Sequence, residues 1–167
     1  MNKIYIEKNT NGDSRVADHE PTIEEFMQAN TSHIVDVANL MQICAHELID
    51  RSCRHDWTKL EEPYRTMFYK DLCATIRGEM NFTDGEWSKL HYTELERHHL
   101  SRHVPDDVDL FDVIEMLCDC VCAGKARNEE ELYLPKIDPE VLNRAFQNTF
   151  QKLAECVEVK DVETPAE

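Results

Sequence analysis

The chain has 167 residues, with 34 acidic and 18 basic side chains, so its formal net charge at pH 7 is −16. A surface of this charge repels the phosphates of DNA and RNA, so we expect no binding of polymeric nucleic acid. No apolar run approaches the length of a membrane span and the N-terminus has no signal-peptide pattern, so we expect neither membrane insertion nor export. Seven cysteines, an odd number lying mostly in apolar segments, indicate a reducing cytoplasm.

Residues 1–21 are expected to form an N-terminal arm or a short β-ribbon. Lys3-Ile4-Tyr5-Ile6 is typical of a strand, and Asn11-Gly12 is a hairpin turn signal, although the segment after it is poor in apolar residues. Thr22 is then expected to cap a brief helix. The helical domain proper is assigned to residues 22–157.

Apolar residues at helical spacing predict a long helix from about Ser32 to Cys53. Glu61-Glu62-Pro63 predicts the start of another helix, because proline is tolerated in a first turn, and Gly78 predicts its end. Thr83-Asp84-Gly85-Glu86 fits a capping box and predicts a further helix that carries three histidines. These histidines are His91, His98 and His99.

The segment from Pro105 to Gly124 predicts a helix with an acidic stripe. Its last acidic residue, Asp119, is flanked by Cys118, Cys120, Val121 and Cys122, so its access to water looks poor. Burying a carboxylate is costly unless it is paired or bound to a metal, which favours Asp119 as a ligand. The nearby cysteines cannot converge on one helix face and are interpreted as small buried hydrophobic residues.

A final helix is expected from Asp138-Pro139-Glu140, followed by an acidic, disordered tail at residues 158–167. The predicted fold class is therefore all-α: one helical bundle of about six helices, with the N-terminal ribbon as its one β element.

The dipeptide His55-Asp56 places an imidazole and a carboxylate side by side. It indicates a site only in combination with the residues around it. These are His33-Ile34 with Val37, then Leu48, Arg51 and Lys59-Leu60, then Arg97-His98-His99, and finally Ile114-Glu115-Met116 with Cys118-Asp119. This order resembles that of the HD-domain metal-dependent phosphohydrolases, and more closely a small HD-like family of phages and bacteria. The resemblance covers roughly residues 33–153; it departs at Trp57-Thr58, where many HD enzymes have an apolar residue and glycine.

The resemblance implies a metal site formed by His33, His55, Asp56 and Asp119. Two nitrogens and two carboxylates suit a divalent ion such as Mn, Fe, Co, Ni or Zn, present as one ion or as two. Such an ion lowers the pKa of its bound water and provides a hydroxide nucleophile at neutral pH.

Further residues are expected to act around this site. Lys59 steadies the phosphate or the attacking water, and Arg97 and His91 bind substrate. His98 and His99 bind phosphate, protonate the leaving group or hold a second metal, although adjacent helix positions make it awkward for both to face the site. Glu115 is expected to orient a ligand histidine.

The leading functional hypothesis is a cytoplasmic phosphohydrolase, a nucleotidase or phosphodiesterase, that acts on a small phosphorylated molecule such as a nucleotide. For a phage protein the compartment is the host cytoplasm. One alternative is an HD-type oxygenase with two irons, for which His91 with His98 or His99 supplies the extra ligands. Another is a non-catalytic binding protein stabilised by its metal. A homodimer through Met80, Phe82 and Tyr133 is a further expectation.

Overall fold

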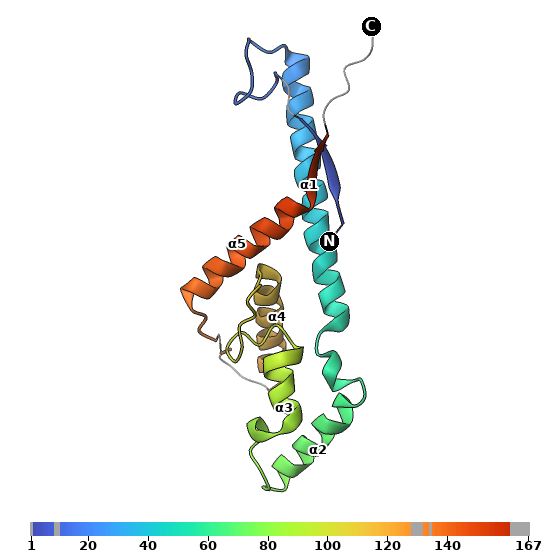
Figure 1. The fold of residues 1–167 in the computed structure, drawn as a ribbon, viewed down its shortest axis with the longest axis vertical. Helices are drawn as coiled ribbons and strands as arrows, with labels where there is room; N and C mark the ends of the chain where they lie inside the picture. Colours follow the sequence, from blue (N-terminus) through green and yellow to red (C-terminus); the bar gives the residue numbers. More distant parts are fainter. Residues whose placement is uncertain (1, 9–10, 128–131, 134, 161–167) are drawn as a thin grey trace. The chain divides into compact units, whose positions relative to one another are not determined.

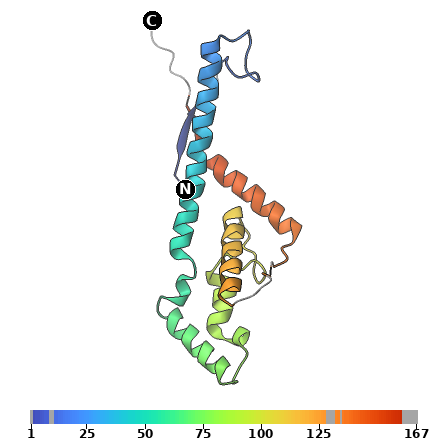
Figure 2. The ribbon, with the colours of Figure 1, turned by 180° about the vertical axis from the view of Figure 1, so that it is seen from behind.

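A computed structural model describes residues 2–8, 11–127, 132–133 and 135–160 (Figures 1 and 2). The described chain contains five α-helices, three single-turn helical segments and one two-stranded sheet, which confirms the predicted all-α class with a short β element. The chain divides into two compact units. The first contains the described residues up to Glu47 and those from Phe150 onward, and the second is Leu48–Thr149.

The sheet of the first unit joins the two ends of the described chain. Strand β1 (Ile4–Glu7) pairs in parallel with β2 (Val157–Lys160), and Ile4 lies opposite Val157. The expected N-terminal β element is present, but β1 pairs with β2 and not across the turn signal at Asn11-Gly12, because the segment that follows has too few apolar residues to form a strand. The predicted disordered tail is wrong over residues 158–160, which belong to β2, and the rest of that tail lies outside the described residues.

Helix α1 (Ile23–Arg54) is one element of 32 residues where two helices were predicted. No glycine or proline interrupts it, so nothing in the backbone ends the first predicted helix. The predicted cap at Thr22 is confirmed: its Oγ1 accepts from Glu25 N (3.2 Å), and Glu25 Oε2 accepts from Thr22 N (2.8 Å). This reciprocal pair satisfies two backbone donors that α1 itself leaves open.

In the second unit, α2 (Tyr64–Ile76) follows Pro63 and ends before Gly78 (φ 74°), as predicted. A 3₁₀ turn, η2 (Phe82–Asp84), comes next, and then α3 (Glu86–Leu90) and the π-helical turn η3 (His91–Leu95). The capping box predicted at Thr83 is absent. The Asp71 carboxylate accepts from Trp87 N (2.9 Å) instead, so a side chain of α2 caps α3.

Helices α4 (Leu110–Ala126) and α5 (Pro139–Glu155) complete the second unit, α5 as far as Thr149. The cap of α4 is a reciprocal pair of acidic side chains rather than Pro105: Asp109 accepts from Asp112 N (2.9 Å), and Asp112 accepts from Asp109 N (3.0 Å). Between these helices and the loop before α4 lies the main buried cluster. Its members are Leu100, Val108, Val113, Met116 and Ala145.

Several expectations about exposure are wrong. Cys118 and Cys122 are exposed rather than buried. Phe82 is half-buried because its ring packs 6.1 Å from that of Phe68, whereas Tyr133 is 75% exposed. Among the described residues, no helix combines the length and the apolar character needed to cross a membrane.

Candidate metal centre

His55 and Asp56 lie in the turn that follows α1. Asp56 has left-handed backbone angles (φ 56°, ψ 28°), which aspartate adopts more readily than most residues, and a 3₁₀ turn, η1 (Trp57–Lys59), follows it. Burial disfavours the charged form of Asp56, but the Lys59 ammonium on its Oδ2 outweighs this and lowers the pKa of the carboxyl. The turn therefore presents an ionised carboxylate next to an imidazole.

His91 is a buried histidine whose tautomer is set by its neighbours. Its ring is 1% exposed and stacks on Trp87, with ring centres 4.2 Å apart. The Thr58 hydroxyl donates to Glu96 Oε1 (3.1 Å), so its oxygen accepts from Nδ1–H of His91 (2.7 Å). Burial lowers the pKa of His91 to about 4. The ring is therefore neutral at pH 7, and its unprotonated Nε2 faces Nε2 of His99 at 2.8 Å.

Of His98 and His99, expected to face the site singly or together, both reach it, an arrangement that adjacent positions on one helix would have made awkward. The helix ends at Leu95 and Glu96 is extended (φ −114°, ψ 119°), so the two histidines lie in a loop. His98 Nε2 lies 3.8 Å from Asp56 Oδ1, and His99 Nε2 lies 2.8 Å from His91 Nε2. Burial lowers the pKa of His99 to about 3. Two neutral imidazoles thus point their Nε2 atoms at each other.

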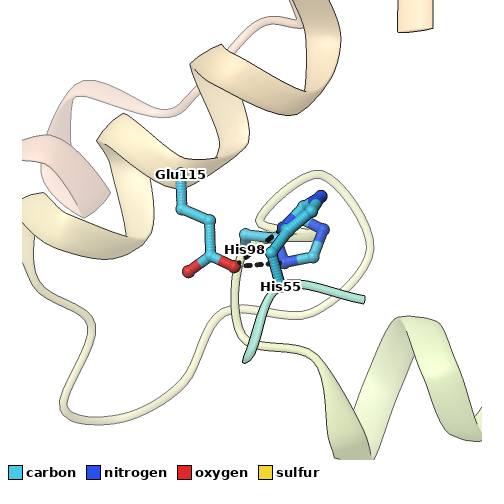
Figure 3. Close-up of side chains that lie close together, drawn as sticks. All are labelled: His55, His98 and Glu115. Atoms are coloured by element: carbon cyan, nitrogen blue, oxygen red, sulfur yellow. Dashed lines mark hydrogen bonds and ion pairs between the residues drawn. The ribbon is translucent and has the colours of Figure 1, made fainter. Parts of the chain in front are cut away.

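Glu115 on α4 orients two of these rings, as predicted for it (Figure 3). Its Oε1 lies 3.0 Å from Nδ1 of His55 and 3.3 Å from Nδ1 of His98. Burial of the Glu115 carboxyl raises its pKa, but His98, His55 and Arg51 outweigh this and bring the pKa to about 2. An ionised Glu115 favours a proton on each Nδ1, which leaves Nε2 of both rings free to bind a cation.

The free ligand atoms converge on Asp56. Four groups of three residues each bring one ligand atom within 4.8 Å of the other two. The groups are His55, Asp56 and Asp119; Asp56, His91 and His99; His98, His99 and Asp119; and His55, His98 and Glu115. Asp56 occurs in two of them, so the cluster has room for one ion or for two bridged by this carboxylate.

Unsatisfied polar atoms support a cation at this place. Among the described residues, the buried side-chain atoms without a hydrogen-bond partner are Asp56 Oδ1, Ser88 Oγ and both ring nitrogens of His98, of which Nδ1 still lies 3.3 Å from Glu115 Oε1. Such atoms are rare in native proteins, because burying them without a partner costs free energy. A divalent cation bound between Asp56 Oδ1 and His98 Nε2 removes that cost for these two atoms, and imidazole nitrogens with carboxylate oxygens suit a borderline divalent ion.

A buried ion-pair network holds α4 against the end of α1 within the second unit. Arg51 Nη1 lies 2.6 Å from Asp112 Oδ1, and its Nη2 lies 3.2 Å from Asp109 Oδ2. Arg97 Nη2 lies 2.8 Å from Asp112 Oδ2. Because Arg51 is four residues before His55, and Asp112 is seven before Asp119, the network fixes these two candidate ligands relative to each other.

The predicted site residues are thus only partly brought together. The second unit gathers His55, Asp56 and Asp119, and Lys59 pairs with Asp56. His33 lies on α1 in the first unit and is in none of the ligand groups found among the described residues. It lines a surface pocket there together with Gly12, Arg15 and other residues of the N-terminal loop.

Arg97, expected to bind substrate, instead pairs with Asp112 and with Asp107 (2.8 Å). The sequence did not indicate two residues of the cluster: Thr58 makes buried contacts with His91 and Glu96, and neither Thr58 nor Glu96 was among the predicted site residues. The acidic stripe did predict Glu115.

An open pocket of about 370 Å³ adjoins the cluster. Its lining is mainly apolar, with a candidate ligand histidine and two carboxylates in its wall. The residues are Leu48, Arg51, Ser52, His55, Ile114, Glu115, Cys118, Asp119 and Cys122. Pockets of this size bind small molecules, and this one could hold a ligand against His55 and Asp119.

Comparison with curated proteins and with solved structures found no match to this chain. A family model does match, over residues 22–158, which includes every residue of the cluster. The chain belongs to that family, DUF5662, a family of unknown function.

Proposed function

We propose that the protein is a metal-dependent phosphohydrolase that acts on a small phosphorylated molecule, most simply a nucleotide. The observation that carries the proposal is the convergence of four imidazoles and two carboxylates around the buried, partnerless Asp56 Oδ1. The resemblance of His55-Asp56, Lys59 and Asp119 to the motifs of HD-domain phosphohydrolases supports it, and we extend that resemblance to a shared fold and chemistry.

His55, Asp56 and Asp119 are the residues we assign to one divalent ion, and His91, His98 and His99 complete the ligand set in place of His33. A bound divalent ion acidifies water and takes up charge from a phosphoryl group. At pH 7 the buried His91 and His99 are neutral, because their pKa values lie near 4 and 3, so each ring keeps one unprotonated nitrogen that can bind a cation. Glu115 keeps His55 and His98 in the ligating tautomer.

Lys59 is the cation that we assign to the phosphoryl group. Its side chain is 38% exposed, so the ammonium can turn from Asp56 toward a bound phosphate. Arg51 and Arg97 stay with their carboxylates and hold the site rigid. The apolar pocket beside His55 receives the uncharged part of the substrate. Because we assign a single cation, Lys59, to the phosphoryl group, the site suits a substrate with one phosphoryl group better than a polyphosphate.

The test is hydrolysis by protein purified without a chelator. Its metal content is measured, and release of phosphate or nucleoside is assayed with nucleoside mono-, di- and triphosphates and cyclic nucleotides. We expect metal-dependent turnover of at least one compound. The Lys59→Ala variant should keep its metal and lose turnover, whereas Lys89→Ala, at an exposed position on α3, should keep both. A metal-loaded protein that is inert on the whole panel would contradict the proposal.

A second candidate is a two-iron oxygenase, which the number of histidines favours. Asp56 lies between the group with His55 and Asp119 and the group with His91 and His99, an arrangement that suits two ions. Two iron atoms per chain, a yellow-brown colour and oxygen consumption with no phosphate release would favour this candidate over hydrolysis.

A further inference from the structure

One face of α1 in the first unit is apolar and exposed. Its large residues Met27, Ile34 and Met41 are 55%, 67% and 67% exposed. Between them lie three small exposed residues, Thr31, Ala38 and Ala45. We name these six residues the open stripe. Both sets repeat every seven residues, the period with which two α-helices pack side by side.

Between Met27 and Ala45 the charged residue Asp36 lies away from the open stripe, and the exposed Glu24 lies beside its end, one turn before Met27. Glu25, Asp36 and Glu47 are half-buried on the side that the chain itself covers, together with the buried Ala29 and Ile43. A surface helix normally shows the reverse, with charges facing water and apolar residues covered. The open stripe therefore has the composition of a contact surface rather than of a solvated one.

The spacing of the open stripe matches itself when reversed. In two antiparallel helices centred at position 36, Met27 comes level with Ala45 of the second helix, Ile34 with Ala38, and Met41 with Thr31. Every layer then contains one large and one small residue, which packs evenly. A parallel pair would instead stack large on large and small on small. A two-fold dimer requires this reciprocity, because residue i meets j wherever j meets i.

Charge and area both fit a second copy of the chain. Two chains of net charge −16 repel each other, so copies can meet only where carboxylates are absent, as along the open stripe. From Met27 to Ala45 the helix is about 27 Å long, and two helices about 10–12 Å wide that meet over this length remove on the order of 1,000 Å² from water. An interface of about 1,000 Å² lies at the lower limit for a specific association, in the range of weak and reversible dimers.

We propose that the protein forms a homodimer in which the open stripe of α1 packs antiparallel on the same stripe of a second copy. This surface differs from Met80, Phe82 and Tyr133, which the sequence had indicated. The proposal is independent of the metal centre, because the open stripe contains none of the candidate ligands.

The test measures the mass of the full chain in solution by sedimentation equilibrium. We expect a dimer, and we expect Met27→Lys and Ala45→Glu each to raise its dissociation constant at least tenfold. The double variant M27K/A45E should restore the dimer, because each lysine then lies level with a glutamate of the other copy. The two sites are 18 residues apart on one helix, so they cannot pair within a chain.

Gln28→Lys and Asn39→Glu, which add the same charges at exposed positions outside the open stripe, serve as matched controls and should leave the dimer intact. Circular dichroism checks that α1 stays folded, and Ile34→Gln replaces Met27→Lys if helix content falls. A monomeric wild type, or single variants that remain dimers, would overturn the interface. A double variant that dissociates further would overturn its antiparallel direction.

Discussion

Asp56 is the residue on which the candidate site depends. It occurs in two of the four ligand groups, and its Oδ1 is buried without a hydrogen-bond partner among the described residues. Its left-handed backbone also turns the chain so that His55 and Asp56 can serve the same cluster. Asparagine tolerates this conformation as well, so the charge can be removed without changing the turn.

We therefore expect Asp56→Asn to lose most of the bound metal and to keep the helical fold. The reason is that the amide offers a weaker ligand and no charge to bridge two ions. Metal content after dialysis and the far-ultraviolet circular dichroism spectrum measure the two effects. Asp106→Asn, at an exposed position before α4, is the control. Equal metal content in Asp56→Asn and in the wild type would remove Asp56 from the site.

At this scale the sequence indicated three of the candidate ligands. His55-Asp56 is recognisable because the two residues are adjacent. The expectation of poor water access that pointed to Asp119 is wrong, because Cys118, Val121 and Cys122 are exposed and Asp119 itself is 27% exposed. His33 fits the same motif, but its position in the sequence does not determine whether the folded chain places its side chain near His55. Thr58 and Glu96 could not be found, because a buried hydrogen bond between residues 38 positions apart leaves no periodic trace.

Among the elements, the short π-helical turn η3 decides the composition of the cluster. An α-helix continued from Glu86 would place His98 and His99 on different faces, and that was the prediction. The structure ends the helix at Leu95, so the loop that follows carries both rings to the site. The sequence contains no glycine or proline at this point, so the end of the helix follows from tertiary contacts, chiefly those that bury His91 and Glu96.

Thr58→Val tests the hydrogen bonds that Thr58 makes with His91 and Glu96. Valine has the shape of threonine but no hydroxyl, so His91 Nδ1 and Glu96 Oε1 lose their shared partner inside the protein. Leaving a buried polar group unsatisfied costs about 1–3 kcal/mol, which is the loss of unfolding free energy that we expect in urea. Metal affinity should fall as well, because the tautomer of His91 is no longer fixed. Thr93→Val, which removes an exposed hydroxyl, should change neither quantity; a stability loss of equal size there would refute the explanation.

The junction of α1 with α4 depends on Asp112, which is fully buried between two guanidinium groups. Removing one partner of a buried ion pair typically costs about 3–5 kcal/mol, because the remaining charges stay buried. We expect a loss of this size for Asp112→Asn, measured by urea denaturation. Asp107→Asn removes an exposed partner of the same Arg97, and such pairs contribute about 0–1 kcal/mol. Similar losses in the two variants would mean that burial does not determine how much Asp112 contributes to the free energy of unfolding.

For the whole molecule, the sequence predicted the fold class but not how the two ends of the chain pair. Helical periodicity is local, so each helix was expected close to where it lies. The parallel pairing of Ile4–Glu7 with Val157–Lys160 joins segments about 150 positions apart. The second segment alternates valine with charged residues, as a strand does, but it has only four residues and its pattern does not say which distant segment it pairs with. The net charge of −16 was visible from the start, and it constrains how copies can associate.

The metal-free protein should lose stability as the pH falls through the range from about 6.5 to 4. Burial holds the pKa of His91 near 4 and that of His99 near 3, so the folded chain keeps both rings neutral while the unfolded chain protonates them. The unfolded state then binds up to two more protons, and the free energy of unfolding decreases with falling pH. His98, whose pKa is raised chiefly by Glu115 against the effect of burial, acts in the opposite sense, but its contribution changes above pH 6.5 and is nearly constant over this range. Urea denaturation in chelator at a series of pH values measures how the free energy of unfolding changes with pH.

We expect His99→Gln to reduce this pH dependence by the equivalent of about one bound proton, because the variant no longer has that ring to protonate in the unfolded state. His46→Gln, at an exposed position of α1, should leave the pH dependence unchanged. An unaltered pH dependence in the His99 variant would mean that its ring titrates alike in the folded and unfolded chain.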